Sequence, residues 1–264
     1  MAASAPDKDF PWWLLAVVAL GGFAYWQILS DDLYTQVLST LRRGIVTTVF
    51  VTLVGFALAA ALGLLLALAA LSRSLILRQV SRFYVEIIRG IPILVLLLYV
   101  AFVLAPALVA LWNWGAESVG ADPIRTRDFN LLWRAILALS IGYSAFLAEV
   151  FRAGLQSVDA GQIEAAEALG LNRWNRFRHI VFPQAIRTIL PPLGNDFVAM
   201  VKDSSLVSVL GVLDITQLGK VTAAGNFRYF ETYNVVALIY LTMTITLSLV
   251  LRRFEKRMRQ RPDG

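Results

Sequence analysis

The feature that most constrains this chain is a stretch without a single charged side chain, from Gly44 to Ser72. A helix that crosses the roughly 30 Å hydrocarbon core of a bilayer needs about 20 mainly apolar residues. The stretch is therefore long enough to cross with some tilt. Gly55, Ala59, Ala60 and Gly63 recur within it at helical spacing, which predicts that a neighbouring helix packs closely against this face.

Other apolar stretches follow at residues 91–112, 131–151, 184–201 and 232–251, and one precedes it at residues 11–29. Only 16% of all residues are charged and 58% are hydrophobic, which is unusual for a soluble domain. The chain is therefore predicted to be an all-α polytopic membrane protein with about six transmembrane helices. Residues 11–29 could also be a signal peptide, but acidic residues precede them and no small-residue cleavage site follows, which favours a retained span.

The segments between these stretches are predicted to include a linker at residues 30–43 and an irregular, partly re-entrant region at residues 204–231. Within residues 184–201, Pro191, Pro192 and Gly194 predict a break in the helix. Irregular backbone at membrane depth is tolerated mainly where it is buried in protein or lines a cavity. The break therefore makes the residues after it candidates for a transport pathway.

Basic residues gather in three segments, at residues 73–82, 173–187 and 252–261. Because Lys and Arg are enriched in cytoplasmic loops, these segments and both termini are predicted to lie in the cytoplasm. Arg42 and Arg43 fall on the predicted outer side and break this rule, but an inverted topology would place the more basic C-terminal tail outside. The same bias accounts for the net charge of +6 without a nucleic-acid partner.

One long polar run with strong helical signals, from Asp159 to Pro183, separates two apolar stretches. Asp159 and Gln162 have the spacing of a capping box, in which two side chains bond backbone amides reciprocally. Gly170 fits the left-handed position that ends a helix, and Asn172 can cap a second short helix at residues 173–181, which Pro183 closes. On pattern alone, the simpler interpretation is a solvated amphipathic loop between two spans.

Several charged or polar residues lie near or within the predicted spans, where they are costly and usually face protein or water. Glu86 with Arg89 has i,i+3 spacing, as has Glu149 with Arg152, so each pair can form an ion pair that pins a helix end or lines a pathway. Arg134 is predicted to be a snorkelling anchor. The pathway candidates are Glu86, Arg89, Glu149, Asn195, Asp196, Lys202 and Asp203. The alternative for the acidic ones is that they only hold helices together.

The chain contains no Cys and a single His, His179. The sequence therefore excludes disulfides, thiolate nucleophiles and cysteine metal sites, and a lone His in a basic loop is predicted to be a surface residue. Without a cluster of carboxylates beside it, neither a catalytic centre nor a metal site is predicted.

The polar run resembles a known motif. Glu164-Ala165-Ala166, then Gly170, then Ile180 to Pro183 are similar to the EAA loop of binding-protein-dependent ABC importers, with Phe182 where that family usually has Leu. The stretches YVEIIRGIP, YSAFLAEVFRAG and LPPLGNDFVAMVKDSSL look like the subgroup that imports polar amino acids. The resemblance covers residues 38–257, and it implies an extra N-terminal span before a five-helix core.

The resemblance implies three segments, namely a tail and extra span at residues 1–34, a permease domain at 35–257 and a cytoplasmic tail at 258–264. It implies a non-catalytic permease subunit of an ATP-driven importer of polar amino acids in the bacterial cytoplasmic (inner) membrane. Its partners would be a second permease, identical or homologous, two cytoplasmic ATPase subunits and a soluble binding protein. The chain has no G-x-x-x-x-G-K-[ST] loop, so it carries no cofactor itself, and ATP and Mg would be bound by the ATPase. The ATPase-coupling residues would be Gly161, Glu164, Ala165, Ala166, Gly170, Ile180 and Pro183.

Two other classes of protein are weighed against this interpretation. A secondary transporter of a small polar solute, driven by an ion gradient, would suit a broken helix with Asn195 and Asp196, but no internal repeat is evident. A membrane enzyme or assembly factor would need a catalytic constellation that the residues do not supply.

Overall fold

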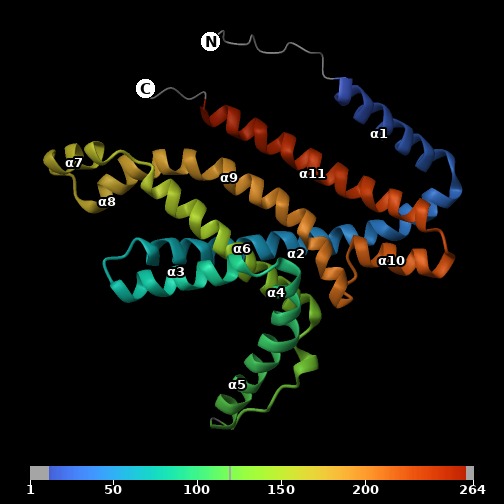
Figure 1. The fold of residues 1–264 in the computed structure, drawn as a ribbon, viewed down its shortest axis with the longest axis horizontal. Helices are drawn as coiled ribbons and strands as arrows, with labels where there is room; N and C mark the ends of the chain where they lie inside the picture. The colour runs from blue at the N-terminus through green and yellow to red at the C-terminus, as the bar shows by residue number, and fades with distance from the viewer. Residues whose placement is uncertain (1–11, 119, 260–264) are drawn as a thin grey trace.

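The computed structural model describes residues 12–118 and 120–259, and the regular secondary structure of this part of the chain consists of helices (Figure 1). The tail predicted at the N-terminus and most of the one predicted at residues 258–264 lie outside the described residues, and the three-segment division stays a prediction. The elements in chain order are α1 (Trp12–Ser30), α2 (Asp32–Ala70), α3 (Leu75–Gly90), α4 (Ile93–Tyr99), the π-helix η1 (Val100–Leu104), α5 (Ala105–Ser118), the 3-10 helix η2 (Thr126–Asp128), α6 (Leu131–Gln156), α7 (Ala160–Ala168), α8 (Arg173–Arg176), the π-helix η3 (Phe177–Val181), α9 (Phe182–Asp203), the 3-10 helix η4 (Ser204–Leu210), α10 (Ile215–Asn226) and α11 (Tyr229–Arg259).

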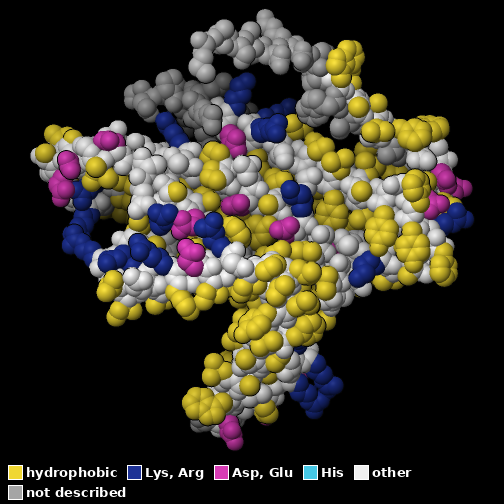
Figure 2. All heavy atoms as spheres, viewed as in Figure 1, with side chains coloured by type: hydrophobic (Ala, Val, Ile, Leu, Met, Phe, Trp, Pro, Cys, Tyr) yellow, Lys and Arg dark blue, Asp and Glu magenta, His cyan; other side chains and the backbone are white. Residues whose placement is uncertain are grey.

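Four helical segments of the described chain are long and apolar enough to cross a membrane. They are α2, the segment Ile93–Glu117 that includes α4, η1 and α5, then α6, and α11. The prediction of a polytopic all-α membrane protein is thereby confirmed, while membrane crossing by α1 and α9 stays a prediction. Figure 2 shows hydrophobic side chains covering the arm formed by α4, η1 and α5. Phe102, Leu108, Leu111 and Trp112 are exposed in this segment.

The centre of the molecule is α6, which packs against α2, α9 and α3. The small residues of α2 make this contact close, as their spacing predicts. A Cβ added to Gly63 would lie 2.9 Å from the Leu147 Cβ and 2.9 Å from the Ser144 carbonyl oxygen. The Ser140 hydroxyl donates to the Gly55 carbonyl at 3.2 Å, so a hydrogen bond reinforces the packing.

The prediction of a linker at residues 30–43 is wrong, because α2 begins at Asp32 and continues without interruption to Ala70. The Asp31 side chain accepts from the Leu33 amide at 2.8 Å and caps the helix. Tyr34, Val37 and Leu41 are buried at i, i+3 and i+7 in a cluster with residues of α10 and α11. Residues 32–43 therefore form part of α2 because they carry a buried apolar face with helical spacing, although the segment also contains polar residues.

The predicted helix break at Pro191, Pro192 and Gly194 is also wrong, since α9 runs from Phe182 to Asp203 with both prolines inside it. Packing holds the helix together on both sides of the prolines. Ile189 and Met200 are buried, and a Cβ on Gly194 would lie 3.3 Å from Leu251 Cδ1 of α11. Because a membrane offers the backbone no water to bond, the helix is the conformation that leaves fewest polar groups unpaired.

The region at residues 204–231 is less irregular than predicted. Ser204 to Leu210 form η4, which Gly211 ends with a φ of +80°, and α10 follows it. The Asp214 side chain caps α10 by accepting from the Gln217 amide at 2.8 Å. Gly44 of α2 lies directly against this cap, because a Cβ there would come within 2.5 Å of the Ile215 nitrogen. Whether this region enters the membrane stays a prediction.

Arg134 is not the snorkelling anchor that its position predicts, because its side chain is only 6% exposed. Its Nε donates to the Phe129 carbonyl at 2.7 Å, its Nη1 to the Ala101 carbonyl at 3.0 Å and its Nη2 to the Thr126 carbonyl. Ala101 belongs to the π-helix η1, a local widening of the helix that often marks a constrained site. Arg134 thus ties η1 to the segment that precedes α6.

Candidate coupling loop and polar wall

The first candidate site is the loop formed by α7 and α8, at the end of the molecule opposite α10 (Figure 1). The predicted cap of α7 is confirmed, since the Asp159 carboxylate accepts from the Gln162 amide at 3.3 Å. The reciprocal half of the predicted capping box is not formed. The Gln162 Oε1 instead accepts a hydrogen bond from the Gln184 Nε2 of α9, at 2.6 Å.

Gly170 ends α7 as predicted, with a φ of +75°. The Leu171 amide donates to the Ala166 carbonyl at 3.1 Å, and the Gly170 amide donates to the Glu167 carbonyl at 2.9 Å. These two bonds are those of a Schellman motif, which requires a left-handed residue at the position of Gly170. The angle between α7 and the helix that follows is therefore set by backbone hydrogen bonds.

The second short helix begins where predicted, because the Asn172 side chain accepts from the Asn175 amide at 2.8 Å. Its end differs from the prediction. The α8 helix passes into η3 and then directly into α9, and Pro183 lies in the first turn of α9 instead of closing the loop. Pro is tolerated there because its ring fits the helical φ, and it follows directly on the π turn of η3.

The loop residues divide into an exposed set and an inward set. Glu164 and Ala165 are exposed, whereas Ala166 is only 4% exposed and is buried within the loop. After the Schellman turn, α8 and η3 both contact α7. The Arg176 Nη1 lies 2.9 Å from the Glu167 Oε2 and joins α8 to α7.

The remaining predicted loop residues are Gly161 and Ile180. Gly161 is exposed, and a Cβ there would come within 2.9 Å of the capping Asp159 Oδ1, so glycine leaves room for the cap. Ile180 is half-buried in η3. His179 is exposed, as predicted for a surface residue.

Two apolar side chains at the tip of this loop escaped the sequence reasoning. Leu169 is 82% exposed and Trp174 is 63% exposed. The Trp174 ring is 6.2 Å from that of Phe177, which is in turn 5.9 Å from that of Phe182. Large exposed apolar groups beside charged residues are typical of interaction surfaces. The sequence does contain a signal for them, because Leu169 and Trp174 are large apolar residues on either side of Gly170 in an otherwise polar run.

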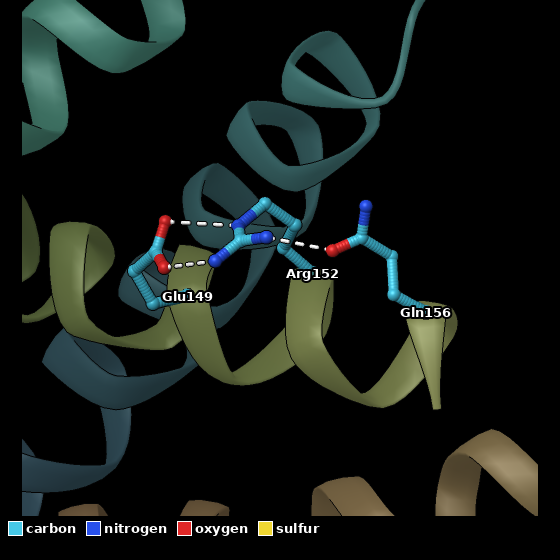
Figure 3. A network of polar contacts seen from close by, with 3 residues as sticks. All are labelled: Glu149, Arg152 and Gln156. Atoms are coloured by element: carbon cyan, nitrogen blue, oxygen red, sulfur yellow. Dashed lines mark hydrogen bonds and ion pairs between the residues drawn. The ribbon is translucent and has the colours of Figure 1, made fainter. Parts of the chain in front are cut away.

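The second candidate site is a stripe of polar and aromatic side chains on α6, here called the polar wall: Tyr143, Phe146, Glu149 and Arg152. Residues three apart are neighbours on a helix surface, so each member of the polar wall adjoins the next, and the stripe winds around α6 along its length. The Arg152 Nη2 lies 2.6 Å from the Glu149 Oε2, and the Arg152 Nη1 donates to the Gln156 Oε1 at 2.6 Å (Figure 3). The predicted ion pair between Glu149 and Arg152 is thus confirmed.

The other predicted pair, Glu86 with Arg89, is not formed, and no ion pair joins these two residues in the described part of the chain. Both are exposed on α3, and the Arg89 guanidinium instead lies 5.7 Å from the centre of the Phe146 ring. This cation–π contact brings Arg89 to the polar wall. Sequence reasoning missed Phe146 because an aromatic residue in an apolar stretch carries no signal of its own.

The α9 candidates approach the same wall from the other side. The Tyr143 hydroxyl donates to the Asp203 Oδ2 at 2.7 Å. Asp196 is half-buried and lies seven residues, or two turns, before Asp203, while Asn195 and Lys202 are exposed. The structure therefore brings together Arg89, Glu149 and Asp203 through side chains of α6, and it leaves Glu86 outside this arrangement.

Comparisons with known proteins bear on both sites. Residues 59–260 match the family described as the binding-protein-dependent transport system inner membrane component. The chain is 36% identical over 219 residues to the probable amino-acid permease protein YxeN of Bacillus subtilis, which covers 83% of this chain and 91% of that protein. It is 35% identical over 219 residues to the glutamine transport system permease protein GlnP of Escherichia coli, with 83% and 93% covered.

Solved structures show the same likeness. A chain from the crystal structure of an amino acid ABC transporter with histidines matches with a TM-score of 0.70 and 36% identity, covering 87% of this chain and 98% of that chain. The inward-facing MetNI methionine ABC transporter matches with a TM-score of 0.65 and 20% identity, covering 86% and 99%. The second match bears on the fold alone.

Proposed function

This chain belongs to the family of binding-protein-dependent transport system inner membrane components, and we propose that the solute it moves is a polar amino acid. As a member it is the permease subunit of an ABC importer, and ATP is bound by an ATPase partner. The single observation that carries the substrate class is the likeness, at 36% identity over 98% of its length, to a solved chain of an amino acid ABC transporter. Two relatives of similar identity, named as an amino-acid permease and a glutamine permease, support the same class.

We infer that the α7–α8 loop is the contact through which the ATPase acts. The loop is a defined body, because a side-chain cap, a Schellman turn and the ion pair of Glu167 with Arg176 fix its two helices. A body of this kind transmits a displacement that a floppy loop would absorb. Its exposed groups Glu164, Ala165, Leu169 and Trp174 would enter the partner, with Gly161, Gly170, Ile180 and Pro183 setting the backbone and Ala166 packing inside the loop.

The polar wall is proposed to face the pathway of the substrate. Asp203 accepts a hydrogen bond from Tyr143 and Arg89 lies over the ring of Phe146, so opposite charges flank two neighbouring side chains of the wall, with Asp196 on the same helix as Asp203. An amino acid carries an ammonium and a carboxylate group, and these two charges would bind one each. Asn195, Lys202 and Glu149 would complete the lining, whereas Glu86 is exposed on α3 and lies outside this group of the described residues.

The proposed assembly contains a second permease, identical or homologous, two ATPase subunits and a soluble binding protein. In the proposed topology α1 and α9 also cross the membrane, which gives six spans with both termini and the α7–α8 loop in the cytoplasm. The positive-inside bias of the loops and tail supports this arrangement. The alternative function, a secondary transporter, relied on a broken helix at Pro191 and Pro192. The continuous helix α9 does not support it.

Uptake by membrane vesicles that contain the whole complex tests the proposed function. Labelled glutamine should accumulate when ATP is supplied inside and the binding protein outside, with or without an ion gradient. Competition with acidic, basic and neutral amino acids then identifies the preferred substrate. Uptake that follows an ion gradient and ignores ATP would contradict the proposal.

A further inference from the structure

A polar pocket of about 540 Å³ lies between the end of α6, the start of α7 and the first two turns of α9. Its lining includes Ser157, Gln162, Gln184 and Thr188, so each of the three elements contributes polar side chains. His179 and Ile180 of η3 also line the pocket, so two elements of the coupling loop, α7 and η3, meet α6 and α9 here. Contacts across the pocket therefore contribute to the attachment of the loop to the spans.

Gln184 makes the central contact. Its Nε2 donates to the Gln162 Oε1 at 2.6 Å and to the Ile180 carbonyl at 3.0 Å. A side-chain amide nitrogen has two protons, so both are used and the amide is held in one orientation. Nearby, the Ser157 hydroxyl lies 3.2 Å from the Thr188 hydroxyl and connects the end of α6 to α9.

The other side of the pocket is a close helix crossing. A Cβ added to Gly154 of α6 would lie 2.2 Å from the Ile189 Cγ1 and 3.3 Å from the Ala185 carbonyl oxygen of α9. Gly154, Ala185 and Ile189 are all buried. Where Gly154 crosses Ala185 and Ile189, α6 and α9 are in direct van der Waals contact. They cannot move closer together there, and a relative motion would take the form of a rotation about this contact.

We propose that Gln184 is a positioning residue for transport: its hydrogen bond to Gln162 fastens α7 to α9, so that a displacement of the coupling loop pivots α9 about its crossing with Gly154. This inference rests on the proposed function of the loop. The pocket leaves room for the motion, and the crossing supplies the pivot. Since α9 carries Asp196 and Asp203, the pivot moves these two carboxylates relative to the polar wall of α6.

The test is a double-mutant cycle in reconstituted complexes, with uptake per ATP hydrolysed as the readout. Gln184→Ala and Gln162→Ala should each lower this ratio by about three- to tenfold, the size expected for losing one hydrogen bond between the moving parts. The double variant should fall no further than Gln184→Ala alone, because that variant already removes the bond to Gln162 together with the bond to the Ile180 carbonyl. A matched control is Gln36→Ala, an exposed glutamine of α2, which should leave the ratio unchanged.

Two further measurements distinguish a role of Gln184 in transmitting the movement of the loop from a role in holding the complex together. The yield of ATPase that co-purifies should stay at the level of the unmodified complex in all variants. The pair Gln162→Glu with Gln184→Lys, which replaces the hydrogen bond by an ion pair, should recover most of the ratio. Additive losses in the double variant, or full coupling in either single variant, would overturn the inference. Failure of the proposed function would show differently, as an unmodified complex that imports no amino acid with ATP.

Discussion

Gly170 is the residue on which the shape of the coupling loop depends, because its φ of +75° is open to glycine and strained for most other residues. No atom lies within 4 Å of an added Cβ, so the obstacle is the backbone conformation alone. Gly170→Val should therefore cost about 1–3 kcal/mol and weaken ATPase binding. Co-purification of the ATPase measures this.

A matched variant at the same position isolates the cause. Asn adopts the left-handed conformation far more readily than a β-branched residue. Gly170→Asn should therefore keep most ATPase binding while Gly170→Val loses it. Equal losses in both variants would show that the side chain itself, and not the φ angle, disturbs the partner.

The two neighbouring alanines of α7 should respond differently to the same large substitution. Ala165 is exposed and Ala166 is buried within the loop. Ala165→Trp should leave the thermal stability of the purified permease unchanged and block the ATPase, whereas Ala166→Trp should destabilise the loop itself by about 1–3 kcal/mol. Limited proteolysis at residues 169–176, without the ATPase present, distinguishes them, and equal cleavage of both variants would refute the assignment.

At the scale of elements, the contact of α2 with α6 depends on the absence of side chains. Gly63→Ala would place a methyl group 2.9 Å from the Leu147 Cβ and from a backbone oxygen, and overpacking of this kind costs about 1–3 kcal/mol. Gly55→Ala, in the same helix, would meet the Met200 Sδ at an ordinary 3.6 Å. Thermal unfolding in detergent should show a clear fall in Tm for Gly63→Ala and little change for Gly55→Ala.

Helices with a clean apolar period were predictable from the sequence, and elements whose form depends on distant contacts were not. The apolar stretch around Gly63 is sufficient to predict a membrane-spanning helix. The extension of α2 to Asp32 depends on burial of Tyr34 and Leu41 against helices more than 170 residues later in the chain. Likewise, the prolines of α9 predict a break by their local chemistry, and packing against α6 and α11 overrides it.

The coupling loop was largely predictable because its determinants are local, namely the caps at Asp159 and Asn172 and the turn at Gly170. The polar wall was only half predictable. Charged residues in apolar stretches stand out, so Arg89, Glu149 and Asp203 were found. Tyr143 and Phe146, which connect them, became visible only when α3 and α9 were placed beside α6.

At the scale of the whole molecule, the topology can be tested cleanly because the natural chain has no Cys. Single cysteines at the exposed positions Ser74 and Arg178 should react with a membrane-impermeant maleimide only from the cytoplasmic side. Cysteines at the exposed positions Asp122 and Asn226 should react only from the outside. An Arg178 position that reacts from outside would contradict the proposed function, because the loop could not reach an ATPase.

The π-helix η3 connects α8 to α9 and holds one more residue in its turn than an α-helix would. A π turn holds about one residue more than an α turn, so it rotates the chain about as far as an α turn with one residue fewer. Deleting one residue from the segment Phe177–Val181, and so restoring an α turn, would therefore keep the direction in which α8 and the Leu169–Trp174 tip leave α9. Deleting a residue from the α-helical first turns of α9 would instead rotate the tip by about 100°. The junction next to the coupling loop can thus lose one residue and still present the same tip to the ATPase, and α9 cannot.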